Sequence, residues 1–279
     1  MEDGYVMESF DVTSLYTNVS KDSALQAVSE ILIEHQTQLN FYGLSISCIM
    51  TLLNECLMCN VFRWSGQYYK QVRGLAMGQR LAPVLAVAFM SKVEEPVLGR
   101  TPVLYCRYID DCFIVCSTQA EMDICFELLN HQSEHIKLTR EVPKDNWLAF
   151  LNVQVHLSKG VCRTMWYRKP SSKNIIVHFS SAHSSGTKKA IIKNMYRTAA
   201  AVSSGAEERT ASIEIAHRVA EANGYPSRAV NEMGRRRRAT AAVRSETEGT
   251  KVAFVCLLYQ MTSLLQYAHA FEKRTSWMQ

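Results

Sequence analysis

The first part of the chain mixes short apolar runs with segments whose apolar residues recur at helical spacing. Residues 5–10 form an apolar-rich run that ends at Asp11, which predicts a strand. Residues 23–39 and 44–58 place apolar side chains three or four positions apart, so each segment predicts an amphipathic helix. The pattern therefore indicates a mixed architecture of strands and helices from the start.

Two later segments predict β-hairpins. The runs at 61–64 and 67–72 flank Ser65-Gly66, and a two-residue link that contains glycine is typical of a hairpin turn. Residues 103–116 are apolar on both sides of Asp110-Asp111. This arrangement predicts a second hairpin with two carboxylates at its tip.

Helical and extended patterns continue along the rest of the chain. A glycine-spaced loop over residues 74–78 leads into a helix that begins near Pro83, a residue tolerated in a first helical turn. Thr118 and Glu121 form a capping box that opens a helix reaching Asn130. Further strands are predicted over residues 136–142, 147–155 and 161–169. Helices are predicted over residues 187–202, 206–223 and 227–242, followed by a strand over 251–258 and a short C-terminal helix.

Composition excludes several classes of protein. Of the 279 residues, 47% are hydrophobic and 20% charged, with 12 Gly and 6 Pro, which excludes disordered, collagen-like and low-complexity chains. The longest strictly apolar run, residues 81–90, is too short to cross a bilayer, so we expect no membrane partner. No basic and then apolar leader follows Met1, so we expect an intracellular protein.

The nine cysteines predict buried thiols rather than disulfides, because the count is odd and no secretion signal accompanies it. Four of them lie among apolar residues: Cys112, Cys116, Cys125 and Cys256. In such surroundings a thiol packs as a small core side chain. Cys56 and Cys59 have the spacing of zinc ligands, but no second pair completes a site.

Positive charge is concentrated in one part of the chain. Residues 163–238 contain 15 Lys and Arg against 5 Asp and Glu, whereas the remainder contains 16 basic and 21 acidic residues. A basic segment attached to a mildly acidic body suggests a polyanionic partner, with a solvated helical surface as the alternative. We place the boundary between these parts at about residues 157–170.

Three carboxylates are candidates for a metal site. Asp110 and Asp111 within an apolar hairpin are costly unless exposed in a turn or neutralised by a cation, and an ordinary polar turn is the alternative. Asp11 also ends an apolar strand. If that strand lies beside the hairpin, the carboxylates converge, an arrangement suited to Mg²⁺. Two such ions, about 3.5–4 Å apart, can activate a hydroxyl and stabilise the leaving oxygen.

Five motifs in order resemble those of reverse transcriptases, in the version closest to Penelope-like retroelements. They are SFDVTSLYTNV at residues 9–19, GLAMGQRLAP at 74–83, YCRYIDD at 105–111, FLNV at 150–153, and YRKP at 167–170 with SAH at 181–183. A single YxDD motif is a weak signal, but five ordered motifs cover most of the chain. The resemblance implies an α+β fold: a right-hand polymerase palm, with an antiparallel sheet and packed helices, followed by a basic, mostly helical thumb.

The same resemblance implies a division into three parts. The palm would cover residues 1–157, a helix-turn-helix-like thumb 158–245, and a short strand–helix remnant 246–279. Family members place a fingers region before the palm, and many Penelope-like proteins carry a GIY-YIG endonuclease. Only ten residues precede Asp11, too few for that fingers region, and nothing after Lys251 resembles the endonuclease. We therefore expect a fragment, a truncated copy or a decayed copy of such an element.

The resemblance also implies roles for individual residues of the palm. Asp11, Asp110 and Asp111 would hold two Mg²⁺ ions, or Mn²⁺ instead, with Asp111 as the secondary ligand. Tyr16 falls where the family places the aromatic residue that selects deoxynucleotides, although simple packing is the alternative. The full set of nucleotide-binding candidates is Val12, Tyr16, Gly78, Gln79 and Arg80.

Two features of the glycine loop bear on nucleotide contacts. Gly74 and Gly78 would let the backbone approach the nucleotide or template, with plain turn chemistry as the alternative. Gln79-Arg80 departs from the Ser-Pro that the family more often has. Gln can hydrogen-bond a base or sugar, and Arg can pair with phosphate.

The basic thumb would contact the backbone of the primer–template. The candidates are Arg168, Lys169, Lys173, Lys188, Lys189, Lys193 and Arg197. Such contacts would be independent of sequence and sensitive to salt. The run Arg235–Arg238 suggests a nuclear-import or phosphate-binding patch, or equally a solvated helix end.

The resulting functional hypothesis is an RNA-directed DNA polymerase that joins a primer 3′-hydroxyl to deoxynucleotides. Its expected partners are an RNA template, a DNA primer or RNA–DNA hybrid, and deoxynucleotide triphosphates, in the nucleus. The first alternative is a catalytically inactive nucleic-acid-binding remnant of such an element. The second is a structural or interaction domain without a nucleic-acid role.

Overall fold

The computed structural model describes residues 4–158 and 161–226. Contacts between Cα atoms divide the described residues into two compact units, one formed by Phe10–Glu141 and the other by residues 4–9 together with 142–226. No helix within the described ranges is long and apolar enough to span a membrane.

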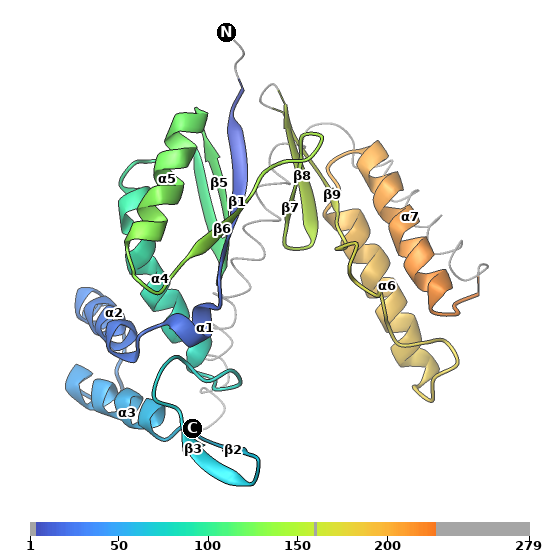
Figure 1. The fold of residues 1–279 in the computed structure, drawn as a ribbon. Helices are drawn as coiled ribbons and strands as arrows, with labels where there is room; N and C mark the ends of the chain where they lie inside the picture. The colour runs from blue at the N-terminus through green and yellow to red at the C-terminus, as the bar shows by residue number, and fades with distance from the viewer. Residues whose placement is uncertain (1–3, 159–160, 227–279) are drawn as a thin grey trace. The chain divides into compact units, whose positions relative to one another are not determined.

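The first unit is built on a four-stranded sheet with the order β4-β5-β1-β6 (Figure 1). Its strands are β1 (Val6–Val12), β4 (Leu104–Tyr108), β5 (Asp111–Cys116) and β6 (Leu138–Glu141). Its helices are α1 (Leu15–Asn18), α2 (Lys21–Glu34), α3 (Ile46–Met58), α4 (Ala82–Leu98) and α5 (Gln119–His131). The α+β class predicted from the sequence is confirmed.

The sheet and its helices enclose an apolar core. Phe10 on β1 and Phe113 on β5 are almost fully buried, and the rings of Phe10 and Phe126 lie 5.0 Å apart in an edge-on arrangement. The predicted start of α5 is confirmed, since the Thr118 hydroxyl accepts a hydrogen bond from the Glu121 N–H. The cap therefore starts α5 at a position from which Phe126 reaches the buried Phe10 on the sheet.

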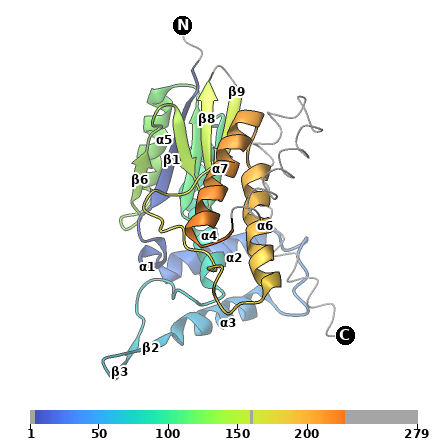
Figure 2. The same cartoon turned by 90° about the vertical axis from the view of Figure 1, so that its right-hand side faces the viewer.

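A separate hairpin joins α3 to the glycine loop. It consists of β2 (Val61–Trp64) and β3 (Gln67–Lys70), paired antiparallel as the sequence predicts. Ser65 and Gly66 both have positive φ, the backbone conformation that two-residue hairpin turns require. Figures 1 and 2 show the hairpin extending beyond the end of α3.

The second unit contains a three-stranded antiparallel sheet, β7 (Trp147–Phe150), β8 (Val153–Ser158) and β9 (Val161–Trp166). The single strand predicted over residues 147–155 is wrong, because the chain reverses within it. Phe150 pairs with Val153, so Leu151 and Asn152 form a two-residue turn in which Leu151 has φ 54°. Two apolar strands that meet at a tight turn without glycine resemble one continuous strand in the sequence.

Two helices pack against β9 in this unit: α6 (Ser185–Ala201) and α7 (Ala206–Ala222). Serine hydroxyl groups in and between these helices accept hydrogen bonds from backbone N–H groups of β9. The Thr164 N–H donates to Ser204 Oγ at 3.0 Å, and the Trp166 N–H donates to Ser212 Oγ at 2.9 Å. The sheet and the helices therefore share one core within this unit.

A short segment before α6 is tied to the end of α7. The Asn223 side chain donates to the Asn174 carbonyl and accepts from the Ile176 N–H, and the Tyr225 hydroxyl donates to the Val177 carbonyl. Gly224 has φ 78°, as the sequence predicts for a residue that ends a helix. The predicted helix over 227–242, the strand over 251–258, the run 235–238 and Cys256 lie outside the described residues.

Candidate active site

The structure brings the first carboxylate segment beside the second. In the sheet, β1 lies next to β5, and the Val12 N–H donates to the Asp110 carbonyl at 3.1 Å. The Thr13 N–H on the following residue donates to the Lys137 carbonyl at 2.8 Å. Asp11 is exposed, and Asp110 is half-buried. Backbone hydrogen bonds therefore hold Asp11 and Asp110 on adjacent segments of one unit.

The Asp110 segment is a tight turn supported from beneath by an arginine. Tyr108 pairs with Asp111, which leaves Ile109 and Asp110 as the turn, and Ile109 has φ 58°. The Arg107 guanidinium donates to the Ile109 carbonyl at 3.0 Å and to Glu94 on α4 at 2.6 Å. This ion pair fastens the turn to α4, and the sequence motifs did not reveal it.

Tyr16 on α1 lies in electrostatic contact with Asp110. Burial, followed by the charge of Asp110 and the phenol of Tyr108, raises the pKa of Tyr16 above its ordinary value. The phenol therefore stays protonated at neutral pH. Tyr16 is half-buried, so its ring is partly available at the same place as the two carboxylates.

The glycine loop packs on the backbone of α1. Gly74 has φ 76°, and a Cβ there would lie 2.7 Å from the Tyr16 carbonyl oxygen and 2.9 Å from the Thr17 Cα. The next residue, Leu75, donates its N–H to that same Tyr16 oxygen at 2.6 Å. Gly74 therefore permits the close approach of the loop to the backbone of α1. Gly78, by contrast, has φ 99° and open space around its missing Cβ.

Gln79 uses its side chain within the protein. Its amide donates to the Cys56 carbonyl at 3.1 Å and accepts from Asn60 at 3.3 Å, which joins the loop to the end of α3. For Gln79 to contact a base or sugar, as expected from the sequence, its side chain would first have to break the hydrogen bonds to Cys56 and Asn60. Arg80 is exposed. Val12, another nucleotide-binding candidate, is buried, so only its backbone faces Asp110.

The carboxylates of Asp11 and Asp110 are suitable ligands for a divalent cation, because Mg²⁺ prefers oxygen donors. Within the described ranges, no three His, Cys, Asp or Glu side chains gather closely enough to hold a metal. Mg²⁺, however, is typically held by one or two carboxylates together with substrate phosphates and water. Asp11 and Asp110 supply that number of oxygen ligands from adjacent segments, with Asp111 at the start of β5.

Three of the four thiols placed among apolar residues by the sequence, Cys112, Cys116 and Cys125, are buried as predicted. The prediction of buried thiols is wrong for Cys48, Cys56 and Cys59, which are exposed. Burial raises the pKa of the Cys112 thiol to about 12. Cys112 is therefore a protonated core side chain next to the carboxylate hairpin.

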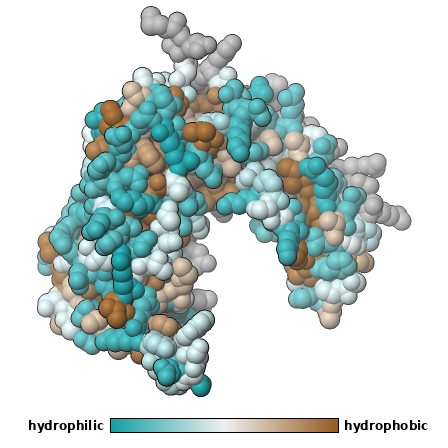
Figure 3. Space-filling model, viewed as in Figure 1, coloured by the Kyte–Doolittle hydropathy of each residue, from teal (hydrophilic) through white to brown (hydrophobic). Residues whose placement is uncertain are grey.

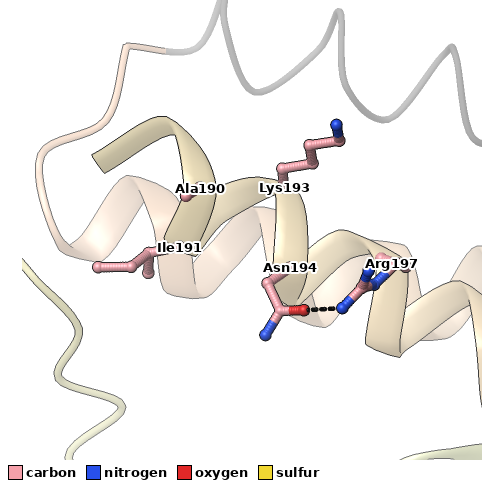
Figure 4. Close-up of a pocket in the computed structure, with 5 residues that line it drawn as sticks. All are labelled: Ala190, Ile191, Lys193, Asn194 and Arg197. Carbon is pink, nitrogen blue, oxygen red and sulfur yellow. Dashed lines mark hydrogen bonds between the residues drawn. The ribbon is translucent and has the colours of Figure 1, made fainter. Parts of the chain in front are cut away.

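The second unit carries a row of exposed cations on α6. Lys189, Lys193 and Arg197 are four residues apart, so they lie on one face of the helix. A surface pocket of about 480 Å³ is lined by this part of α6 (Figure 4). In it, Arg197 donates to Asn194 at 2.6 Å. These three cations are available to a ligand of opposite charge.

Lys188 does not share that role in the structure. Its ammonium donates to the Phe179 carbonyl at 2.7 Å and to the Ser181 carbonyl at 2.6 Å, and it lies 5.7 Å from the centre of the Phe179 ring. Lys188 therefore holds the segment that contains Phe179 and Ser181 against the first turn of α6. Helical spacing alone does not distinguish it from its exposed neighbour Lys189.

Arg168 and Lys169 line a larger cavity of about 510 Å³, which lies between the β7–β8 turn, the end of β9 and α6. Arg168 donates to Asn174 at 2.9 Å, and its guanidinium lies 5.4 Å from the centre of a Trp166 ring. Lys169 is exposed, as is Lys173. The cavity thus offers two cations: Arg168, which is held by Asn174 and Trp166, and Lys169, which is exposed.

Comparison with protein families gave two matches. A family described as reverse transcriptase (RNA-dependent DNA polymerase) matches residues 3–162, and one described as animal helix-turn-helix domain matches residues 175–232. The second match includes α6 and α7. Comparison with curated proteins gave no match.

Comparison with solved structures gave similarity to yeast telomerases. Telomerase from Candida albicans, in complex with a TWJ fragment of telomeric RNA, has a TM-score of 0.55 and 12% identity, covering 99% of this chain and 51% of that one. Apo telomerase from Candida tropicalis, truncated from its C-terminal domain, has a TM-score of 0.46 and 13% identity, covering 57% of this chain and 35% of that one. The chain thus spans about half the length of the first. At 12% identity, the similarity to it concerns the fold alone.

Proposed function

Because this chain belongs to the reverse transcriptase (RNA-dependent DNA polymerase) family, we propose that it copies an RNA template into DNA. In this reaction a primer 3′-hydroxyl attacks the α-phosphate of a deoxynucleotide, and pyrophosphate leaves. The observation that carries the proposal is the backbone bond that joins β1 to the Asp110 turn. It holds Asp11 and Asp110 on neighbouring segments at the end of the sheet.

In this proposal, Asp11 and Asp110 hold Mg²⁺, with Asp111 as a secondary ligand. When bound, the ion would lower the cost of deprotonating the primer hydroxyl and neutralise charge on the phosphates. The contribution of the protein is to keep the two carboxylates fixed before substrate arrives. The Arg107–Glu94 pair supports this, since it fastens the turn that carries Asp110 to α4.

Tyr16 is the proposed sugar gate. Its ring lies half-buried beside Asp110, where burial and the charge of Asp110 raise the pKa of the phenol above its ordinary value. A half-buried ring packed at this position would collide with a ribose 2′-hydroxyl but not with a deoxyribose. Gly78 and Arg80 are the further candidates for the nucleotide, through an open backbone and an exposed cation.

The row Lys189, Lys193 and Arg197 is proposed to contact the sugar–phosphate backbone of the primer–template. Exposed cations on one helix face suit phosphates spaced along a strand, and they read no sequence. Lys169 and Lys173, also exposed, extend this set. The match of residues 175–232 to a helix-turn-helix family supports a nucleic-acid role for these helices.

The five ordered motifs lead us to propose a Penelope-like retroelement as the origin of the chain. A DNA product made for a genome implies a nuclear location, to which the run at residues 235–238 would contribute. Fluorescence imaging of the tagged chain with and without these four arginines tests that location. Unchanged cytoplasmic signal in both forms would contradict it.

Primer extension on an RNA template tests the polymerase. We expect Mg²⁺-dependent incorporation of deoxynucleotides, lowered at least about a hundred-fold by Asp110→Asn, because a lost metal ligand is worth several kcal/mol. Asp22→Asn, at an exposed carboxylate in the first turn of α2, is the matched control and should retain activity. Equal activity of the two variants would refute the assigned site. Binding of RNA–DNA hybrid without incorporation would identify a binding remnant.

A further inference from the structure

The β2–β3 hairpin is the most unusual surface of the first unit. All eight of its strand residues are exposed, including Trp64 at 69% and Tyr68 at 75%. A two-stranded hairpin without a covering layer is marginally stable in water, and proteins rarely leave grouped aromatic rings exposed. Exposed aromatic surfaces of this kind mark interaction sites.

The register of the hairpin separates its side chains into two faces. Residues directly opposite each other in an antiparallel pair point to the same side, and successive pairs alternate. One face therefore carries Phe62 with Tyr69 and Trp64 with Gln67. The rings of Phe62 and Tyr69 stack, with centroids 5.7 Å apart and planes inclined by 22°. We call this the aromatic face.

The opposite face carries the charges. It consists of Val61 with Lys70 and Arg63 with Tyr68, and the Arg63 guanidinium lies 5.9 Å from the centre of the Tyr68 ring. Residues 60–80 as a whole contain four basic residues and no acidic ones. Figure 3 shows the hairpin as a largely white surface, because tyrosine and tryptophan have intermediate hydropathy. The segment is thus aromatic and cationic rather than aliphatic.

We propose that the aromatic face of the β2–β3 hairpin binds unpaired bases of a single-stranded nucleic acid. Flat exposed rings stack on the faces of bases, and those faces are available only where the strand is not in a duplex. The positive charge of residues 60–80 attracts the phosphates that accompany the bases. Identification of this strand as the template ahead of the primer rests on the proposed polymerase function.

A protein partner is less well supported by the same surface. A protein partner of this segment would need an acidic surface, because the segment carries charges of only one sign. Exposed rings on one face, with basic side chains on the other face and in the following loop, are compatible with a single strand whose bases stack and whose phosphates meet the cations. Self-association of the chain through the hairpin would count against the proposal.

The experiment measures binding of the full chain to fluorescein-labelled single-stranded RNA and DNA and to a blunt duplex, by fluorescence anisotropy. We expect Trp64→Ala combined with Phe62→Ala to weaken single-strand binding about 10- to 100-fold, since each stacked base contributes roughly that range. Trp64→Phe should retain most of the affinity, because it keeps a ring. Tyr42→Asn, which removes a 78% exposed aromatic outside the hairpin, is the matched control and should change little.

The outcomes separate this inference from the polymerase proposal. Unchanged single-strand affinity in the double variant, with primer extension intact in the wild-type chain, would overturn the hairpin inference alone. Weakened single-strand binding with no extension by any form would support the hairpin while refuting the polymerase. A change of oligomeric mass in light scattering, with no change in nucleic-acid affinity, would show instead that the hairpin is a protein interface. Thermal unfolding confirms that the exposed substitutions leave the fold intact.

Discussion

Arg107 and Glu94 form a two-bond ion pair beneath the turn that carries Asp110. The Arg107 Nε lies 2.6 Å from Glu94 Oε2 and its Nη2 lies 3.2 Å from Oε1, with the two side chains only 8% and 12% exposed. A third nitrogen of the same guanidinium donates to Ile109. One residue therefore connects α4, β4 and the carboxylate turn.

Arg107→Met should destabilise the protein by about 3–5 kcal/mol, because it leaves the carboxylate of Glu94 buried without its partner. Urea denaturation measures the change. The double variant Arg107→Met with Glu94→Met should recover much of the loss, as paired removal leaves no buried charge. A double variant as unstable as the sum of the two single variants would show that the pair does not interact as described.

Gly74→Ala should destabilise the fold far more than Gly43→Ala. Both glycines have positive φ, 76° and 82°, so each alanine costs about 1–2 kcal/mol in backbone strain. Only at Gly74 would the added Cβ also lie within 3 Å of Tyr16 and Thr17, whereas nothing lies within 4 Å at Gly43. Thermal or urea unfolding compares the two, and equal losses would contradict the close packing of the loop on α1.

Tyr16→Ala should relax the choice of sugar in primer extension. Removing the ring opens space for a 2′-hydroxyl, so the preference for deoxynucleotides should fall by roughly 10- to 100-fold, the range for a single steric contact. Single-nucleotide incorporation of deoxy- and ribonucleotides measures the ratio of kcat/KM. An unchanged ratio together with lower stability would indicate that Tyr16 serves packing alone.

Lys188 and Lys193 should respond differently to neutralisation. Lys193→Gln should leave stability within about 0.5 kcal/mol, but it should lower the slope of log affinity against log salt by about one for an RNA–DNA hybrid. Lys188→Gln should instead cost about 1.5–3 kcal/mol in stability, since two hydrogen bonds from a charged group are lost. Salt titrations and denaturation distinguish these results, and identical salt slopes for the two variants would refute the assignment.

Alkylation should separate the cysteines by burial. At pH 8, iodoacetamide should label Cys48, Cys56 and Cys59 but not Cys112, which mass spectrometry of the peptides can follow. Burial holds the pKa of Cys112 at about 12, above its value of roughly 8.5 in an unfolded chain. The folded protein therefore binds more protons between these values, and its stability should fall as pH rises through that window. Cys112→Ala should show less of this fall.

The sequence by itself determined those helices, strands and turns that depend on residues close together in the chain. The capping box at Thr118 and the Ser65-Gly66 turn depend on neighbouring residues, and both occur as predicted. The apolar run before Asp11 and the paired runs around Asp110 gave their strands for the same reason. Their order along the chain also indicated the family, so the α+β fold and the candidate carboxylates were accessible without a structure.

Tertiary structure decided whatever depends on contacts between distant residues. The reversal at Leu151 has no glycine to mark it, so only pairing of Phe150 with Val153 reveals two strands. Lys188 and Lys189 are adjacent and chemically alike, yet the carbonyls of Phe179 and Ser181 engage only the first. Apolar periodicity records which side chains avoid water; it does not record which buried or charged group meets which partner, because that depends on how the segments pack.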